Sequence, residues 1–160
     1  MAYAVGLLVL LIGLLASIAL HEVGHMVPAK RFGVRVSQYM VGFGPTLWSR
    51  TKGETEYGLK AIPLGGYVRL VGMYPPADVV GATPGTGRFS GLIDAAREAS
   101  AEEIRPGEDH RAFYRLSTPK KVVVMLGGPV MNLLIAVVLV GIVLVGIGTA
   151  GPATTTVGVI

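Results

Sequence analysis

Cysteine is absent from this sequence of 160 residues, and charged residues are scarce. The absence of cysteine excludes disulfide bonds and metal sites built on thiolates. Charged residues make up 15% of the chain, whereas an ordinary soluble domain has about 25%. Because 51% of the residues are hydrophobic, the composition disfavours an ordinary soluble domain.

Charge is missing altogether from both ends of the chain. Residues 1–20 and 122–160 contain no Asp, Glu, Lys or Arg. A membrane-spanning helix needs roughly 20 apolar residues, since the hydrocarbon layer is about 30 Å thick and each helical residue rises about 1.5 Å. The sequence therefore predicts transmembrane helices at 1–27 and 122–150. A signal peptide fits the first poorly, because a charged leading region and a small-residue cleavage site are lacking.

All 14 lysines and arginines lie in the loop between these helices. Basic residues mark the cytosolic side of membrane proteins. We therefore expect the loop 28–121 in the cytosol, and the N-terminus and the residues after Ala150 outside the inner (plasma) membrane. The basic residues nearest the helices decide this assignment: Lys30, Arg31, Arg35, Arg115, Lys120 and Lys121. No recognition helix or aromatic–basic face is evident, so we expect membrane lipid and no nucleic acid as a partner.

Two kinds of sequence follow one another in the loop. Residues 34–70 are rich in apolar and β-forming residues with glycine and proline breaks, which predicts a small sheet that touches or re-enters the membrane. Residues 73–110 are rich in Pro, Gly, Ala and acids, which is typical of a flexible linker, with one short helix at 92–104. The predicted fold class is a membrane α-helical protein with a small membrane-associated β-sheet.

Prolines and glycines within the apolar segments predict local features. Pro28 is expected to stop the first helix. The pair Gly127 and Gly128 would let another helix backbone approach closely. Pro129 would kink the second helix or begin its main segment. Residues 151–160 are typical of a turn followed by the first strand of an outside domain.

The segment "HEVGH" near the inner end of the first helix predicts a metal site. His21 and His25 are separated by one helical turn, so both imidazoles project from one face, where they can bind one zinc ion. Glu22 can act as general base for a zinc-bound water, and Gly24 leaves room for a neighbouring backbone. The alternative is a pair of helix-end histidines and a solvated glutamate near the headgroups. It is disfavoured because ionisable residues in a membrane segment are costly and usually functional.

Four blocks, in this order, resemble the N-terminal part of the site-2 protease family of intramembrane zinc metalloproteases. They are "HEVGH", "VGFGPTLWSR", "YGLKAIPLGGYVRL" and "GGPVMN". The closest resemblance is to bacterial regulators of envelope stress that carry an outside PDZ domain. It implies that His21 and His25 bind Zn²⁺, that Glu22 is the catalytic base, and that "AIPLGGYV" belongs to a re-entrant β-element near the active site.

The β-element is a candidate substrate clamp, because a sheet edge can pair with an unwound substrate. We expect Gly65, Gly66, Tyr67 and Val68 to contact the substrate. A packed sheet without substrate contact is the alternative. Asn132 could polarise a substrate carbonyl or bond to the first helix, although simple helix packing is favoured for it.

A catalytic zinc usually has three protein ligands, and this sequence offers two. His110 lies in a hydrophilic loop, where a surface position is favoured over a ligand. The resemblance implies that the third ligand is an aspartate of a Leu-Asp-Gly motif beyond residue 160. We therefore expect the chain to be a fragment that binds zinc weakly and lacks activity alone, with a PDZ-like domain beginning at 151–160.

The expected function is zinc-dependent endoproteolysis within the membrane. The resemblance implies regulated intramembrane proteolysis of single-span membrane proteins such as anti-sigma factors. Another membrane zinc protease, with a site facing the soluble side, is a second possibility. A catalytically inactive scaffold that binds single-span partners through the β-element is a third, although a scaffold has no need of Glu22.

Overall fold

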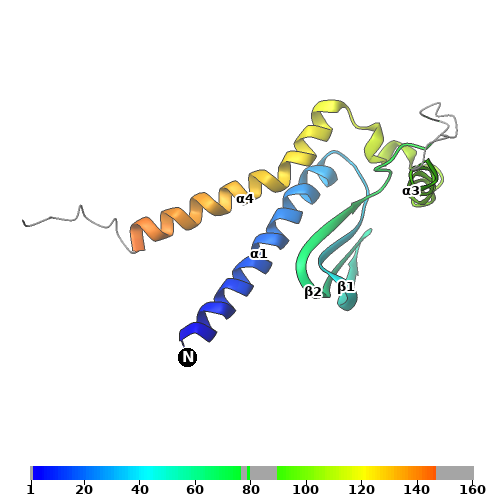
Figure 1. Cartoon of the computed structure of the whole chain (residues 1–160). Helices are drawn as coiled ribbons and strands as arrows, with labels where there is room; N and C mark the ends of the chain where they lie inside the picture. The colour runs from blue at the N-terminus through cyan, green and yellow to red at the C-terminus, as the bar shows by residue number, and fades with distance from the viewer. Residues whose placement is uncertain (1, 77–78, 80–89, 147–160) are drawn as a thin grey trace, which may run out of the picture.

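The computed structural model describes residues 2–76, 79 and 90–146 (Figure 1). Two long helices, α1 (Ala2–Arg31) and α4 (Thr118–Gly146), pack together near one end and diverge toward the other. A hairpin of two long strands lies beside the second half of α1. The short helix α3 (Ser90–Glu102) and the turns η1 (Asp109–Arg111) and η2 (Phe113–Arg115) precede α4 in the chain. Both long helices are long and apolar enough to cross a membrane.

Helix α1 continues past Pro28, so the expectation that this proline stops it is wrong. The helix ends instead at a glycine cap. The N–H of Val34 donates to the carbonyl of Ala29, and the N–H of Gly33 donates to that of Lys30, each at 3.0 Å. This is the Schellman pattern, which needs a left-handed residue, and Gly33 has φ of 82°. A cap that satisfies the last carbonyls thus decides the boundary, four residues later than predicted.

Helix α4 begins at Thr118, four residues before the predicted start, and Pro119 falls in its first turn, where a missing N–H costs little. Pro129 lies inside the helix, which excludes the prediction that it begins the main segment. Figure 1 shows α4 changing direction in its yellow N-terminal part, as expected for a proline that cannot donate to the carbonyl four residues earlier. Residues 147–150 of the predicted span and 151–160 of the predicted outside domain lie outside the described residues.

The two helices cross where each has glycine. A Cβ on Gly24 would lie 3.0 Å from the Cα of Gly128 and closer still to the backbone of Gly127. A Cβ on Gly127 would likewise collide with the Gly24 carbonyl. Only glycine allows this approach, so the predicted close packing at Gly24, Gly127 and Gly128 is confirmed.

Strands β1 (Val36–Lys52) and β2 (Thr55–Leu70) form an antiparallel hairpin around a two-residue turn, Gly53–Glu54. Gly53, the first turn residue, has φ of 65°, whereas Glu54 does not have a positive φ, since among the described residues only glycines do. This combination fits a type II′ turn. The predicted β-region is therefore confirmed as a sheet.

The hairpin is also folded over on itself, which the sequence did not predict. Gln38 pairs with both Arg69 and Glu56, and Val41 pairs with both Gly66 and Leu59. From the pair Gln38–Glu56 to the pair Val41–Leu59, the residue numbers increase along both strands. The first half of β1 therefore runs parallel to the first half of β2. Four segments thus lie side by side, in the order 46–52, 55–60, 36–43 and 62–70.

A small core forms where the hairpin, the end of α1 and the start of α4 meet. Its buried side chains are Ala29, Val34, Val36, Leu70, Phe113 and Val124. These residues come from positions widely separated in the sequence. The core therefore fixes the sheet against α1 at the end where the two long helices cross.

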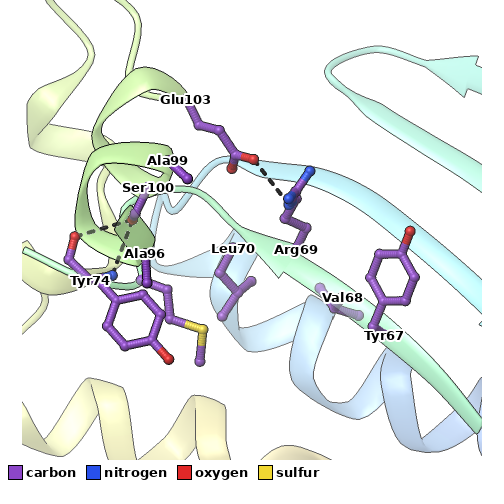
Figure 2. A pocket seen from close by; sticks show the side chains of 10 residues that line it. Tyr67, Val68, Arg69, Leu70, Tyr74, Ala96, Ala99, Ser100 and Glu103 are labelled. Carbon is purple, nitrogen blue, oxygen red and sulfur yellow. Dashed lines mark hydrogen bonds and ion pairs between the residues drawn. The ribbon is translucent and has the colours of Figure 1, made fainter. Parts of the chain in front are cut away.

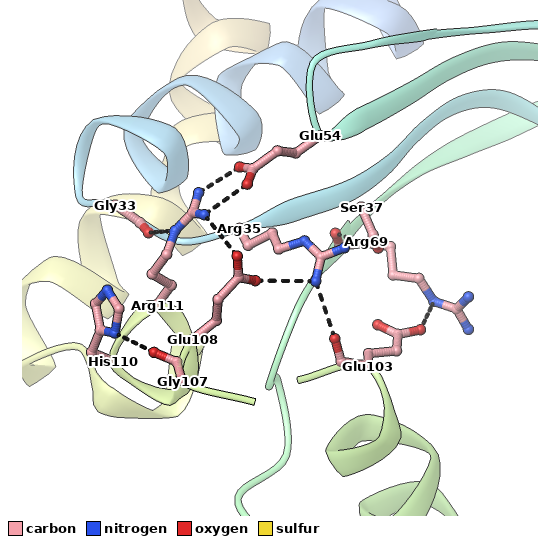
Figure 3. Close-up of polar contacts among 10 residues, drawn as sticks. All are labelled: Gly33, Arg35, Ser37, Glu54, Arg69, Glu103, Gly107, Glu108, His110 and Arg111. Carbon is pink, nitrogen blue, oxygen red and sulfur yellow. Dashed lines mark hydrogen bonds and ion pairs between the residues drawn. The ribbon is translucent and has the colours of Figure 1, made fainter. Parts of the chain in front are cut away.

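The segment before α4 is connected to the rest of the molecule by ion pairs (Figure 3), and α3 lies close to the predicted short helix at 92–104. Arg111 donates to both carboxylate oxygens of Glu54, at 2.8 and 2.6 Å, and to the carbonyl of Gly33. Arg35 donates to Glu108 at 3.3 Å and to the carbonyl of Glu103. These contacts connect the hairpin turn, the end of α1 and the segment after α3.

Candidate metal centre

His21 and His25 face each other on one side of α1. Their ring centroids are 4.9 Å apart with an interplanar angle of 79°. The two Nε2 atoms are 3.2 Å apart. Two nitrogens bound to one tetrahedral zinc at 2.0–2.1 Å are separated by about 3.3 Å. The imidazole pair therefore has the separation that a shared zinc ion requires.

The orientation of His25 is fixed by helix α4. Its Nδ1 lies 2.8 Å from the carbonyl oxygen of Val124, which can only accept a hydrogen bond. Nδ1 therefore carries the proton, and the lone pair of a neutral His25 lies on Nε2. Metal-binding histidines are commonly held in this way by a backbone carbonyl. Nδ1 of His21 is buried and has no hydrogen-bond partner within the described residues.

Gly128 of α4 leaves space beside both imidazoles. A Cβ built on Gly128 would lie 2.6 Å from Nε2 of His21 and closer to Nε2 of His25. Zinc–nitrogen bonds are about 2.0–2.1 Å long, so this position lies a few tenths of an ångström beyond bonding distance from both nitrogens. The missing side chain thus leaves open the volume that a shared metal would fill, and the residues present fit a zinc ion.

Glu22 lies next to the histidines and is half-buried against the sheet. A Cβ on Gly66 of β2 would lie 3.0 Å from Cγ of Glu22 and 3.1 Å from Cγ2 of Ile18. On the same side of α1, Tyr39 donates its hydroxyl to the carbonyl of Ala19 at 2.8 Å. The carboxylate therefore lies where helix α1 and the last segment of β2 meet.

The predicted substrate-binding residues divide into those close to Glu22 and those apart from it. Gly66 is the closest. Gly65 follows the bend of the strand with φ of 123°, and a Cβ built on it would collide with the ring of Phe43. Tyr67 stacks on Phe43 and donates to Gln38 at 3.3 Å, while Val68 packs against the core. Asn132 is exposed on α4, and no hydrogen bond of its side chain is found among the described residues.

No group of three His, Asp or Glu side chains that could hold a metal is found in the described ranges. His110 is exposed, and its Nδ1 lies 3.2 Å from the carbonyl of Gly107. This agrees with the surface position expected for it. The predicted third ligand falls outside the chain and stays a prediction.

A separate hollow of about 230 Å³ lies between the end of β2 and α3 (Figure 2). An ion pair of 3.0 Å between Arg69 and Glu103 lies at one side, and Ser100 bonds to the backbone of Tyr74 at the other. No histidine lines it. It is therefore not part of the candidate metal centre.

Sequence reasoning missed two features of the centre. The Val124 carbonyl has no side-chain signature, and only the crossing of the helices reveals its contact with His25. Gly128 was expected to serve helix packing, yet its hydrogen faces the imidazoles as well. The available signal was its place in a glycine pair before Pro129.

Comparison with known proteins identifies the family of this chain. A model of peptidase family M50 matches residues 9–158. Zinc metalloprotease Rip1 of Mycobacterium tuberculosis is 42% identical over 139 residues, 87% of this chain and 28% of that protein. The Rip1 of Mycolicibacterium smegmatis is 37% identical over 165 residues, covering 99% and 34%. Protease RseP of Yersinia pestis is 34% identical over 122 residues, covering 76% and 21%.

This chain thus spans about a third or less of the length of these curated relatives. The relatives from both mycobacterial species are named zinc metalloproteases, so the cofactor of the family is Zn²⁺. The family match extends over most of the sequence, from the first helix to beyond α4. The chain belongs to peptidase family M50, the site-2 proteases.

Proposed function

We propose that this chain is the zinc-binding N-terminal part of an endopeptidase that cleaves single-span membrane proteins within the membrane. His21 and His25 are the proposed ligands and Glu22 the proposed catalytic base. The observation that carries the proposal is the 3.2 Å separation of the two Nε2 atoms, beside the open volume at Gly128. The third ligand is the aspartate beyond residue 160 that the family resemblance implies.

The residues of this chain have separate roles in that chemistry. His21 and His25 would hold a zinc ion, which when bound would supply Lewis-acid chemistry: a water with a pKa near 7 and a polarised scissile carbonyl. The Val124 carbonyl holds the His25 ring so that Nε2 faces the open volume. Glu22 accepts the proton of the attacking water at its carboxylate and passes it to the leaving amine.

The distribution of polar and apolar side chains supports a proposed placement in the membrane. Helices α1 and α4 are the proposed spans, with the N-terminus outside, the loop between them cytosolic and an outside domain after α4. Large apolar side chains near the bend of the hairpin are exposed: Phe43, Leu47, Ile62 and Leu64. The ion pairs of Glu54 and Arg111 lie at its other end, beside the end of α1. We infer that the bend enters the membrane and the ion pairs stay at its cytosolic face.

The sheet edge gives a route for an extended substrate. The segment 62–70 pairs with β1 on one side, and no described strand covers its other side. Gly66 on this segment lies against Glu22. A substrate strand added here would place its peptide bonds near the base. Anti-sigma factors are the proposed substrate class, on the family resemblance.

The test uses the full-length protein reconstituted with a single-span substrate. Glu22→Gln keeps the size of the side chain and loses the base, so cleavage should fall by at least 100-fold, with zinc content unchanged. Equal cleavage by both forms would contradict the proposed enzymatic activity and favour a scaffold.

Zinc analysis is a second test. It should find about one ion in the full-length protein and less than one in the 160-residue chain. Tight stoichiometric zinc in the short chain would contradict the proposed third ligand.

A further inference from the structure

The end of β1 forms a basic and aromatic hollow on the opposite edge of the sheet from Gly66. The hollow has a volume of about 350 Å³ and is lined by Trp48, Arg50, Thr51, Lys52 and Tyr57. Alternate residues of a strand share a face, so Trp48, Arg50 and Lys52 form one column. Tyr57 lies directly opposite Arg50 in the register. The hollow therefore combines two cations with two aromatic rings.

No acid forms an ion pair with the basic residues of the hollow in the described part of the chain. Of the nearest acids, Glu54 pairs with Arg111 at 2.6 Å, and Glu56 accepts a hydrogen bond from Gln38 at 2.9 Å. Neither Arg50 nor Lys52 has an ion-pair partner among the described residues. Lys30 adds a third cation, because its Nζ donates to the Tyr57 hydroxyl at 2.8 Å.

The edge segment changes from apolar to basic residues along its length, as expected for a segment that crosses from the membrane interior to its surface. Leu47 is 67% exposed and Trp48 is 58% exposed, and they lie on the side of the apolar bend. Arg50 and Lys52 follow toward the ion-paired turn. Tryptophan is enriched at the membrane–water interface, and basic residues on the cytosolic side attract anionic lipids.

We propose that this hollow binds the phosphate of an anionic phospholipid, with the acyl chains lying along Leu47 and Trp48. The proposal rests on the membrane placement inferred above. The Arg50 guanidinium can donate two parallel hydrogen bonds to phosphate oxygens, and Lys52 and Lys30 add point charges. The adjoining apolar side chains favour a lipid over a soluble phosphate. A lipid held here fixes the depth of the sheet, and through its pairing the depth of Gly66 beside Glu22.

The test is a titration of the purified chain in a neutral detergent. Trp48 is the sole tryptophan of this sequence, so its fluorescence reports the hollow directly. Phosphatidylglycerol should give a saturable change, whereas phosphatidylcholine, with no net charge, should not. The double substitution Arg50→Gln and Lys52→Gln should raise the half-saturating phosphatidylglycerol concentration at least fivefold. Arg97→Gln with Arg105→Gln removes the same charge elsewhere and should leave it unchanged.

Three outcomes would overturn the proposal. They are equal responses to the two lipids, equal half-saturation in the charge-reduced and control variants, and saturation by soluble glycerol phosphate at the concentration that suffices for the lipid. Carbonate extraction of cell membranes tests the membrane placement separately. A chain that stays in the membrane yet shows no lipid preference contradicts the lipid site alone, whereas a chain that is extracted contradicts the proposed placement itself.

Discussion

Gly128 shapes the candidate metal centre through the side chain that it lacks. Its backbone belongs to the helix crossing, and its open side faces both imidazoles. One residue therefore serves two requirements, the approach of two helices and the space for a metal. Comparing an alanine substitution at Gly128 with one elsewhere on α4 distinguishes these two requirements from a general effect on helix stability.

Gly128→Ala should weaken zinc binding by at least tenfold, because the added Cβ would lie 2.6 Å from Nε2 of His21 and closer to His25. The measurement is zinc retention by the full-length protein against a competing chelator. Gly141→Ala is the matched control on the same helix, since nothing lies within 4 Å of its Cβ position. Equal zinc retention by the two variants would contradict the role given to Gly128.

The candidate ligands were accessible from the sequence, whereas their surroundings were not. The spacing of His21 and His25 requires only one helix, so a local pattern was sufficient to bring them together. The hydrogen bond from His25 to Val124 joins positions 99 residues apart and involves a carbonyl that every residue has. Gly66 beside Glu22 depends in the same way on how the sheet packs against α1.

At the scale of elements, the end of α1 shows how a cap can outweigh a proline. Pro28 removes one helical hydrogen bond, yet the cap at Gly33 satisfies the last carbonyls and the core buries Ala29 and Val34. The prediction from Pro28 considered the local cost only. The curled hairpin was missed for a similar reason, because positive φ at Gly42 and Gly44 bends β1 where the sequence suggested a break.

Gly33→Ala should lower the free energy of unfolding by about 1 kcal/mol, because alanine is strained at φ of 82°. The measurement is a denaturant titration in detergent, followed by circular dichroism. Gly13→Ala is the control, since this glycine lies inside the same helix with open space around it. It should not destabilise the chain, because alanine is the better helix former. A loss of similar size in both variants would argue against the cap.

The ion pair between Glu54 and Arg111 makes the attachment of the hairpin turn dependent on pH. The hydrogen bonds from Arg111 hold the pKa of Glu54 below its ordinary value of 4.5. A lowered folded-state pKa stabilises the fold above the unfolded value, and the contribution is lost as pH falls through the folded value. Wild type should therefore have a higher Tm than Glu54→Gln at pH 7, and the difference should shrink as pH falls below 4.5 and through the lower folded-state pKa of Glu54.

The exposed acid Glu98 of α3 provides the control, since Glu98→Gln should match the wild-type Tm at pH 7. Thermal melts in one detergent between pH 7 and pH 3 make the comparison. A Tm difference for Glu54→Gln that grows on acidification would show that the sign of this linkage is wrong.

At the scale of the whole molecule, the proposed topology can be mapped because the chain has no cysteine. Leu64 at the bend of the hairpin and Leu92 on α3 are almost equally exposed, at 73% and 72%. In membrane vesicles a soluble maleimide should label Leu92→Cys from the cytosolic side and leave Leu64→Cys unlabelled, because the proposed topology buries the bend in lipid. Tyr3→Cys should react from the outside only.

Detergent solubilisation should make Leu64→Cys reactive, which shows that the thiol is intact. Equal labelling of Leu64→Cys and Leu92→Cys in sealed vesicles would place the hairpin in water. Labelling of Tyr3→Cys from the cytosolic side would invert the proposed orientation.

Helices α1 and α4 are in close contact where their glycines cross, and this crossing lies beside the two histidines. A tilt of one helix against the other would therefore pivot at the crossing. Gly146 lies 18 residues beyond Gly128, which is about 27 Å along the helix. A tilt of α4 by about 10° around the crossing would swing that far end by about 5 Å. The imidazoles, close to the pivot, would hardly move. A load on the Gly146 end of α4 would thus separate the far ends of the two helices much more than it would displace the backbone at the crossing.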